Sequence, residues 1–454
     1  MRSRTIYIIL VFVLLVLPAA ATLIAGGEEA GEREEITADL TSLEGLGSWF
    51  ETHFAGRSSM ITMNALLKRS FLGSSYGDEI IIGKDGYLFY EGTLDDYFRR
   101  NPMTERELFI AAYNLSLMQE YCEANGASFI FMLCSNKNTL YPQYMPDHYL
   151  QGEGKTNTAR LLPYLDQLGV HYIDMYPVLA GREDIYFRRD THWTQAGALY
   201  GYEAVMEALG RPLLNSEEGV WNTQKHAGDL EQMLLPDAYT LEEAPVRHIP
   251  WQYSADEEAS AQNVHTENVQ GTGSLLMFRD SFGTDLLPYL AQTYARCWFT
   301  QVWPCIMDDV QAADADDVIL EKVERNLPDL TKRPLIMQSP QITPGIYEIR
   351  ETETLVVLEP EGPYIRIWAE VPSSLTEDET RMYIGTDAGA GQVYRAVLSV
   401  GTDAEGPGCY ICVPRDSLQE KTELEVYLED GGSWCRIFRG SAQIPPSWHS
   451  ADPS

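Results

Sequence analysis

Two hydrophobic patterns alternate along the middle of the chain. Segments whose apolar residues recur at helical spacing are followed by short, nearly continuous apolar runs. The runs lie at 128–134, 170–175, 273–279, 297–302 and 317–320, and the helices are expected at 105–125, at 157–168, after Thr194 and from Thr284. Strands of a parallel sheet have this composition because helices cover both faces of the sheet. The pattern predicts an α/β domain with a parallel sheet, which we place at residues 76–338, beginning with a β-hairpin over 80–90.

The pattern changes at residues 339–345, where Pro and Gly cluster and we expect a linker. Beyond it, short runs of β-branched and aromatic residues are separated by Gly, Pro and acidic turns. Such spacing is typical of antiparallel sheets packed face to face. Residues 346–445 are therefore predicted to form an all-β, sandwich-like C-terminal domain.

The N-terminus carries a different signal. Residues 5–25 contain no charge, and Arg2 and Arg4 precede them. A bilayer core needs roughly 20 apolar residues, and basic residues favour the cytoplasmic side. We expect a cytoplasmic tip and transmembrane anchor at 1–27, a membrane-proximal helical region at 28–75, and the bulk of the chain outside the cytoplasm as a single-pass cell-membrane protein. The alternative is a signal peptide cleaved at a small-residue site, which would give a secreted protein.

Composition restricts the partners. The chain has 33 Lys and Arg against 67 Asp and Glu, a formal net charge of -34, so its overall field repels nucleic acid. Its 7 cysteines include one Cys-x-x-Cys pair, Cys409 and Cys412, without the second pair or the histidines that a zinc site needs. We expect no nucleic-acid partner, no metal and no cofactor.

Two segments carry candidate chemistry. Asp190 and His192 stand two residues apart, so an extended backbone points both side chains the same way. Ser281 follows the apolar run 273–279 and precedes a helix, which presents a serine at the carboxyl edge of the sheet. In this arrangement His192 takes the Ser281 proton and Asp190 orients the imidazole. By spacing alone the alternative stays open: Asp280 and Ser281 only cap a helix, and the Asp-x-His pair lies in a solvated loop.

Six short motifs follow one another within about residues 49–327. They are Gly83-Lys-Asp-Gly-Tyr-Leu-Phe89, Lys137-x-x-x-Tyr141-Pro, Asp190-Thr-His-Trp-Thr-x-x-Gly197, Gly228-Asp-Leu230, Arg279-Asp-Ser-Phe-Gly283 and Asp317-Val-Ile-Leu-Glu-x-Val-Glu-Arg325. Together they resemble the alginate O-acetyltransferase J/X family and the related bacterial DHHW proteins. The resemblance implies an SGNH-hydrolase-like, three-layer domain that transfers acetyl groups onto extracellular polysaccharide, with Ser281 as nucleophile, His192 as base and Asp190 as acid. It also implies a multipass membrane acyltransferase as the acetyl donor.

The chain departs from the family motifs at two points. Thr191 stands at the first histidine of the DHHW motif, and Arg279 stands where a Gly-Asp-Ser motif has glycine. Arg279 and Gly283 are therefore candidates for the oxyanion or substrate contacts. Lys137 and Asn138 follow a predicted strand and are further candidates, with a solvated strand exit as the alternative.

Aromatic residues in the C-terminal domain offer a second kind of site. Trp368 and Trp434 are candidate stacking platforms for a glycan, and the alternative is that they fill the core of the sandwich.

Three functions follow from these observations. The first is an extracytoplasmic O-acetyltransferase that acts on a cell-surface or secreted polysaccharide through an acyl-serine intermediate. The second is a carbohydrate acetylesterase with the same triad, because exclusion of water separates transfer from hydrolysis. The third is a non-catalytic glycan-binding or scaffold partner of a membrane acyltransferase.

Overall fold

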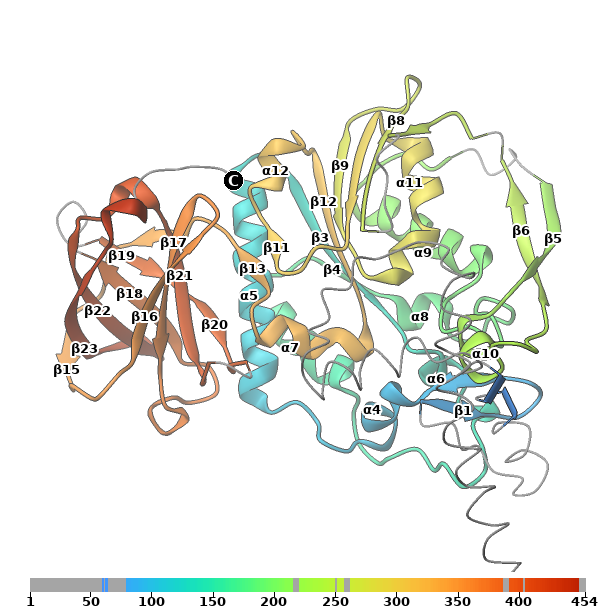
Figure 1. Cartoon of the computed structure of the whole chain (residues 1–454), viewed down its shortest axis with the longest axis horizontal. Helices are drawn as coiled ribbons and strands as arrows, with labels where there is room; N and C mark the ends of the chain where they lie inside the picture. The colour runs from blue at the N-terminus through green and yellow to red at the C-terminus, as the bar shows by residue number, and fades with distance from the viewer. Residues whose placement is uncertain are drawn as a thin grey trace, which may run out of the picture. The chain divides into compact units, whose positions relative to one another are not determined.

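The computed structural model describes most of the chain after residue 78 (Figure 1). The described residues are 59–60, 62–63, 79–214, 220–249, 251–256, 262–386, 392–402 and 405–448. The expected anchor at 1–27 and nearly all of the expected helical region at 28–75 lie outside them. Within the described part, no helix combines the length and apolar character needed to cross a membrane.

The chain divides into two compact units, which we describe separately. The smaller unit contains the described residues up to Glu91 together with 188–190 and 225–242. The larger unit contains the rest, including the central sheet and the C-terminal strands.

A seven-stranded sheet forms the centre of the larger unit. Its order is β4 (Tyr172–Asp174), β3 (Ser128–Cys134), β12 (Asp317–Val323), β9 (Ser274–Phe278), β10 (Arg296–Thr300), β8 (Asn263–Glu267) and β7 (Ser254–Ala255). The five strands from β4 to β10 are parallel, whereas β8 and β7 add antiparallel edge pairs. Every residue of β9 and β12 is buried, as the continuous apolar runs predict for strands covered on both faces.

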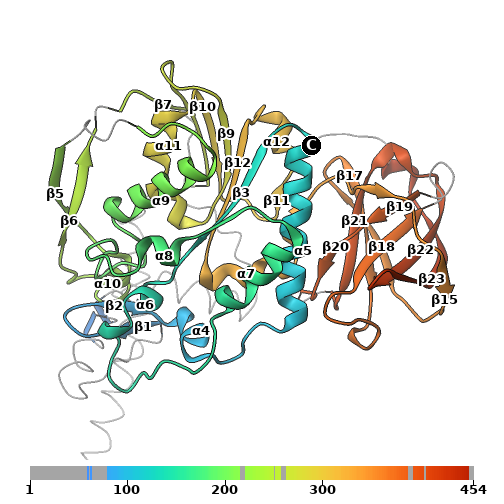
Figure 2. The ribbon, with the colours of Figure 1, turned by 180° about the vertical axis from the view of Figure 1, so that it is seen from behind.

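Helices cover both faces of this sheet (Figures 1 and 2). The helices are α5 (Glu105–Ala124) and α7 (Asn157–Leu168) on one face, and α8 (Met175–Leu179), α9 (Gln195–Ala208) and α11 (Leu287–Thr293) on the other. Local signals set several helix ends: Thr104 and Glu107 form a capping box at α5, and the Thr194 hydroxyl caps α9. The expectation of a helix from Thr284 needs correction, because a 3₁₀ turn, η3 (Ser281–Asp285), comes first. The α-helix then starts only at Leu287, with a proline in its first turn.

The C-terminal strands form two antiparallel-rich sheets. One has the order β14 (Gln341–Ile342), β19 (Gln392–Arg395), β18 (Arg381–Thr386), β22 (Lys421–Asp430), β23 (Ser433–Gln443) and β15 (Tyr347–Ile349). The other has the order β16 (Val356–Glu361), β17 (Tyr364–Glu370), β21 (Gly408–Pro414) and β20 (Val397–Ser399). The segment at 339–345, expected as a linker, contains β14, which pairs with β19.

One hydrophobic cluster runs from α5 and the central sheet into these strands. At its centre the fully buried Asn114 amide donates to the carbonyls of Leu330 and Leu398, at 2.9 Å each, and accepts from the Leu398 N–H. An amide buried in this way is stabilising only while all of these bonds are made. The C-terminal sheets therefore share a core with α5.

The smaller unit contains the expected hairpin. Strands β1 (Ile80–Ile82) and β2 (Leu88–Tyr90) pair antiparallel, and their apolar residues pack with helix α10 (Asp229–Leu234). The Leu88 N–H donates to the Arg188 carbonyl at 2.8 Å, so the hairpin is tied to the segment that ends at Asp190.

Candidate active site

Ser281 stands at the carboxyl end of β9, where the chain turns into η3. The Asp280 carboxylate caps the turn by accepting the Phe282 N–H at 2.9 Å. Phe282 and Gly283 are buried, whereas Ser281 is exposed. The turn therefore presents one hydroxyl to solvent on an otherwise buried support.

His192 reaches the same point from a separate loop. Tyr186 and Trp193 form an antiparallel bridge at the base of this loop, and the Phe187 N–H donates to the His192 carbonyl at 3.2 Å. The Nε2 atom of His192 lies 2.8 Å from the Ser281 hydroxyl oxygen. This is hydrogen-bond reach for a base that removes the serine proton.

The other ring nitrogen of His192 has a neighbour of its own. Its Nδ1 lies 3.1 Å from the hydroxyl oxygen of Thr191, the residue at the first histidine of the DHHW motif. A contact at Nδ1 helps to fix the ring orientation and the tautomer. Thr191 is thus placed to influence which nitrogen of His192 faces Ser281.

Asp190 belongs to the smaller unit and has two partners there. Its Oδ2 atom accepts from the Asp229 N–H at 3.0 Å and lies 2.8 Å from Nε2 of His226. The Asp190 side chain is 6% exposed, whereas that of His226 is 36% exposed, so the carboxylate is buried and its histidine partner reaches solvent. Its role as the acid of a triad stays a prediction from the resemblance.

His226 is a residue that sequence reasoning missed. Its sequence neighbours show no catalytic spacing, yet its ring nitrogen lies 2.8 Å from Asp190, the predicted acid of the triad. A signal was present nearby, because the family-like Gly228-Asp-Leu230 motif begins two residues after His226.

The oxyanion assignments need correction. The Gly283 N–H already donates to the Glu321 carboxyl at 3.1 Å, so it does not point toward an oxyanion. The Arg279 side chain is 5% exposed, and its guanidinium donates to the Asp280 carbonyl and the Thr284 hydroxyl. Burial lowers the pKa of this guanidinium. Arg279 and Gly283 therefore build the turn from inside.

Lys137 and Asn138 are also buried and are not a solvated strand exit. They lie in the short helix α6 (Lys137–Leu140), at 5% and 1% exposure. The Lys137 amine donates to the Phe187 carbonyl at 3.2 Å, and the Asn138 amide donates to the Thr93 hydroxyl at 2.8 Å. Both bonds lie within the larger unit, and the Lys137 bond supports the loop that carries His192.

Of the two glycan-stacking candidates, Trp368 does not fit the role. It is 2% exposed and stacks on Tyr410 inside the C-terminal sheets, so its ring has no free face. Trp434 is half-buried, stacks on Tyr383 with centroids 4.3 Å apart, and lines a hollow of about 690 Å³. Trp434 therefore remains a candidate.

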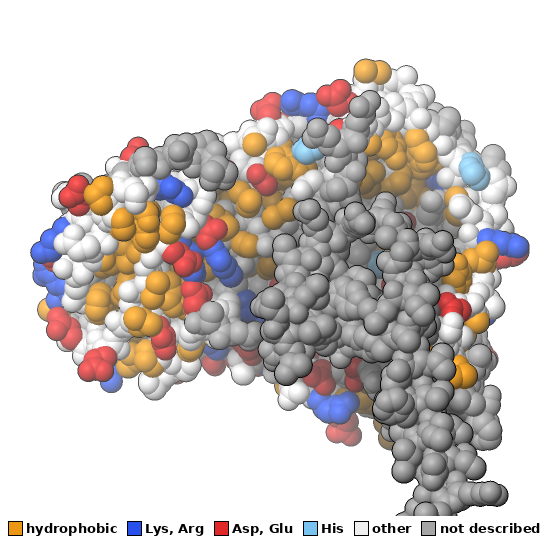
Figure 3. All heavy atoms as spheres, in the orientation of Figure 1, with side chains coloured by type: hydrophobic (Ala, Val, Ile, Leu, Met, Phe, Trp, Pro, Cys, Tyr) orange, Lys and Arg blue, Asp and Glu red, His pale blue; other side chains and the backbone are white. Residues whose placement is uncertain are grey.

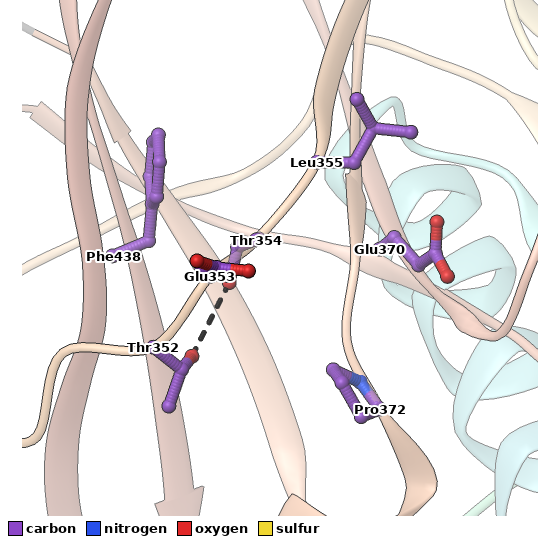
Figure 4. Close-up of a pocket in the computed structure, with 7 residues that line it drawn as sticks. All are labelled: Thr352, Glu353, Thr354, Leu355, Glu370, Pro372 and Phe438. Atoms are coloured by element: carbon purple, nitrogen blue, oxygen red, sulfur yellow. Dashed lines mark hydrogen bonds between the residues drawn. The ribbon is translucent and has the colours of Figure 1, made fainter.

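A second hollow lies in the same C-terminal region. It measures about 460 Å³ and is lined by Thr352, Glu353, Thr354, Leu355, Glu370, Pro372 and Phe438 (Figure 4). Leu355 is 59% exposed. Apolar side chains are visible on the surface of the C-terminal strands (Figure 3). Neither hollow includes Ser281 or His192, so the candidate active site is identified by its bonding geometry and not by cavity size.

Comparison with known families bears directly on the resemblance. Residues 80–272 match the family described as the SGNH hydrolase-like domain of the acetyltransferase AlgX. The resemblance is confirmed. The match covers Asp190 and His192 but ends before Ser281, so Ser281 is a candidate nucleophile because of its contact with His192 and not because of the family match.

Solved structures of low sequence identity are similar to parts of the chain. A DHHW family protein from Eubacterium siraeum is 17% identical over 48% of this chain and 85% of its own, with a TM-score of 0.39. PatB1 of Bacillus cereus is 16% identical over 56% and 97%, with a TM-score of 0.43. The O-acetyltransferase domain of Pseudomonas putida AlgJ is 20% identical over 55% and 92%, with a TM-score of 0.37. No curated protein matches the chain.

Proposed function

We propose that this protein is a serine acyltransferase that moves acetyl groups onto a cell-surface or secreted polysaccharide outside the cytoplasm. The observation that carries the proposal is the 2.8 Å contact between His192 Nε2 and the hydroxyl of the exposed Ser281. A serine, a base within reach and an open position beside them are what acyl transfer requires.

The chemistry takes two steps. Ser281 Oγ attacks the carbonyl carbon of an acetyl donor while His192 Nε2 accepts the serine proton. The bond to the leaving group breaks, His192 returns the proton to that group, and acetyl-Ser281 remains. A glycan hydroxyl then attacks the acetyl-serine, gives its proton to His192 and leaves as the acetyl ester, while Ser281 regains a proton.

Two further observations support the proposed acceptor and cellular setting. The apolar run at 5–25 behind Arg2 and Arg4 favours export, with the chain kept at the membrane or released after cleavage. The family match is to a domain described as that of an acetyltransferase. We propose a polysaccharide acceptor and a multipass membrane acyltransferase as the source of the acetyl group.

Hydrolysis is the second candidate. Ser281 is exposed, and water that reaches the acetyl-serine gives a carbohydrate acetylesterase with the same residues. The acceptor alone separates the two reactions.

The test is the intact mass of the soluble part, from about residue 28 onward, after incubation with 4-nitrophenyl acetate. We expect one added acetyl group that maps to Ser281, is absent in Ser281→Ala, and leaves when a glycan acceptor is added. Turnover of the ester without transfer to any glycan would establish the esterase. If wild type and Ser281→Ala show neither labelling nor turnover, the non-catalytic scaffold function replaces both.

A further inference from the structure

Glu321 is a fully buried carboxyl directly behind the turn of Ser281. It lies on β12, next to β9 in the sheet, and its side chain is 0% exposed. Its Oε2 atom accepts the N–H groups of Asp280 and Gly283, both at 3.1 Å. These two residues flank Ser281, so one oxygen holds the turn on both sides of the nucleophile.

The Asp280 carboxyl in turn accepts hydrogen bonds from residues at and beyond the end of β12. While Oδ1 caps the turn, Oδ2 accepts the Val323 N–H at 2.9 Å and the Asn326 side-chain amide at 2.8 Å. The end of β12 and the nucleophile turn therefore exchange hydrogen bonds through two carboxyl groups. Paired bonds of this kind leave the turn little freedom to shift or rotate.

The hydrogen bonds of the Glu321 and Asp280 carboxyl groups leave one backbone N–H of the turn without a partner in the part of the chain that the structure describes. The N–H groups of Asp280, Phe282 and Gly283 are all bonded to carboxyl oxygens. Among the described residues, the Ser281 N–H has no hydrogen-bond partner, and it sits on the exposed residue of the turn. A donor left open beside the attacking oxygen is suited to stabilise a developing oxyanion.

We propose that Glu321 is a positioning residue for the nucleophile: its buried carboxyl fixes the turn so that Ser281 Oγ faces His192 and the Ser281 N–H faces the oxyanion. This inference rests on the proposed acyl transfer and adds a residue to it. Glu321 touches no substrate and acts only through residues 280–283.

The groups around Glu321 influence the protonation state of its carboxyl. Asp280 from the turn, Cys134 from β3 and Lys322 on its own strand interact with it electrostatically. Burial first, and then the Asp280 carboxyl, raise the pKa of Glu321 well above its usual value. A neutral acid still offers a carbonyl oxygen to two N–H groups, and so does the amide of glutamine.

The test compares substitutions that keep or remove that oxygen. Glu321→Gln keeps an acceptor of the same length, Glu321→Asp withdraws it by one methylene, and Glu321→Leu removes it. The probe is phenylmethylsulfonyl fluoride, which reacts when Ser281 Oγ attacks sulfur. The O–S bond forms, the S–F bond breaks, and the serine proton passes through His192 and leaves with fluoride. Intact mass against time gives the maximal labelling rate and the half-saturating reagent concentration.

We expect Glu321→Gln to label Ser281 within about 3-fold of the wild-type maximal rate. Glu321→Leu should be slower by roughly 100-fold, the scale for loss of one oxyanion donor, with little change in the half-saturating concentration. Glu321→Asp should lose at least about 10-fold, because a small misplacement of reacting groups is costly. This second variant keeps a carboxyl on the strand and so tests the inference even if Glu321→Leu does not fold.

The matched control is Asp317→Leu, at the opposite end of β12. Asp317 is 1% exposed and accepts from Arg211 at 2.7 Å and Tyr294 at 2.8 Å, far along the strand from Ser281. We expect it to lower the melting temperature while Ser281 labelling stays within about 3-fold. Equal labelling in Glu321→Asp and wild type, or equal losses in Glu321→Gln and Glu321→Leu, would overturn the inference.

The probe also separates this inference from the proposed function. If Ser281 is sulfonylated but never acetylated, acetyl transfer is wrong, and the Glu321 variants still decide whether the turn is positioned in this way. If neither reagent labels wild-type Ser281, the serine is not a nucleophile and both proposals fail.

Discussion

The Trp193 indole N–H donates to the carbonyl of Phe282 at 3.1 Å. Trp193 follows His192 and Phe282 follows Ser281, so this bond joins the loop of His192 to the turn of Ser281, one residue beyond each of the two proposed catalytic residues. Trp193 is 0% exposed, and its ring also packs against Phe282 with centroids 5.6 Å apart. The separation of His192 from Ser281 is thus fixed by a buried contact behind them.

Trp193→Phe removes the donor and keeps most of the ring. A buried carbonyl that loses its partner costs about 1–3 kcal/mol, so we expect a lower melting temperature. We also expect labelling of Ser281 by 4-nitrophenyl acetate to slow by about 10-fold or more, since the two loops are no longer tied. The control is Trp298→Phe on β10, where a half-buried tryptophan bonds to Asn263 at 3.5 Å in the same sheet. Equal labelling rates in the two variants would contradict the prediction.

Gly283→Ala tests the packing of the nucleophile turn. A Cβ at this position would meet Arg279 Cβ at 2.7 Å and Met277 Cε at 2.9 Å. Because Arg279 Cβ is next to the backbone, the turn has to move, at a cost of about 1–3 kcal/mol. Urea unfolding should show this loss, and Ser281 labelling should fall in parallel. Gly385→Ala, where the nearest atoms lie at 3.3–3.5 Å, serves as control and should change both quantities less.

His226→Gln asks whether the partner of Asp190 matters for catalysis. If Asp190 orients the base, Asp190→Asn should slow acylation by roughly 10⁴-fold, the scale of the loss when a catalytic histidine loses its carboxylate. Removing the 2.8 Å bond from His226 should give a smaller loss in the same direction. The measurement is the rate of Ser281 acetylation in each single variant and in the double variant. An Asp190→Asn protein that acylates at the wild-type rate would remove Asp190 from the mechanism.

Glu324 gives the stability of the protein a dependence on pH. This carboxyl is buried at the end of β12 and accepts from the Asn136 N–H and the hydroxyls of Thr139 and Thr158. Burial outweighs these bonds and raises the pKa of Glu324 to about 7. The folded state therefore holds this proton more tightly than the unfolded state, in which the pKa is about 4.5. The stabilisation is complete below about pH 4.5 and is lost as the pH rises through about 7.

Glu324→Gln should remove that dependence, because its amide stays neutral. The free energy of unfolding of the wild type should fall by up to about 3 kcal/mol more than that of the variant between pH 4.5 and pH 8. Urea titrations at pH 5, 6, 7 and 8 measure the difference between the two proteins. Asp309, whose pKa burial raises to about 6, contributes equally to both and cancels. Parallel curves for wild type and Glu324→Gln would show that Glu324 titrates normally.

The sequence by itself determined the architecture of the central domain. The runs at 128–134, 273–279 and 317–320 are mainly apolar because helices cover both faces of the strands, so each run can be recognised without knowing its partner strand. Helix caps such as Thr104 and Thr194 also depend on local sequence, because a capping side chain bonds to a backbone N–H only two or three residues away. The hairpin at 80–90 and the positions of His192 and Ser281 at loop ends belong to the same class of local signals.

Only the tertiary structure decided which groups meet. His192 and Ser281 are 89 residues apart in the sequence. The hydrogen bond that the Gly283 N–H donates to Glu321 depends on the register between β12 and β9. No local pattern states which N–H a buried carboxyl will accept, so Gly283 looked like an oxyanion donor until its bond to Glu321 was seen. The burial of Trp368 was also decided by the tertiary structure. The sequence around an aromatic residue in an antiparallel strand does not show whether its side chain lies on the inner or the outer face of the sheet. Interactions between residues close in sequence can be predicted from the sequence, whereas the pairing of distant strands is fixed only when the hydrophobic core forms.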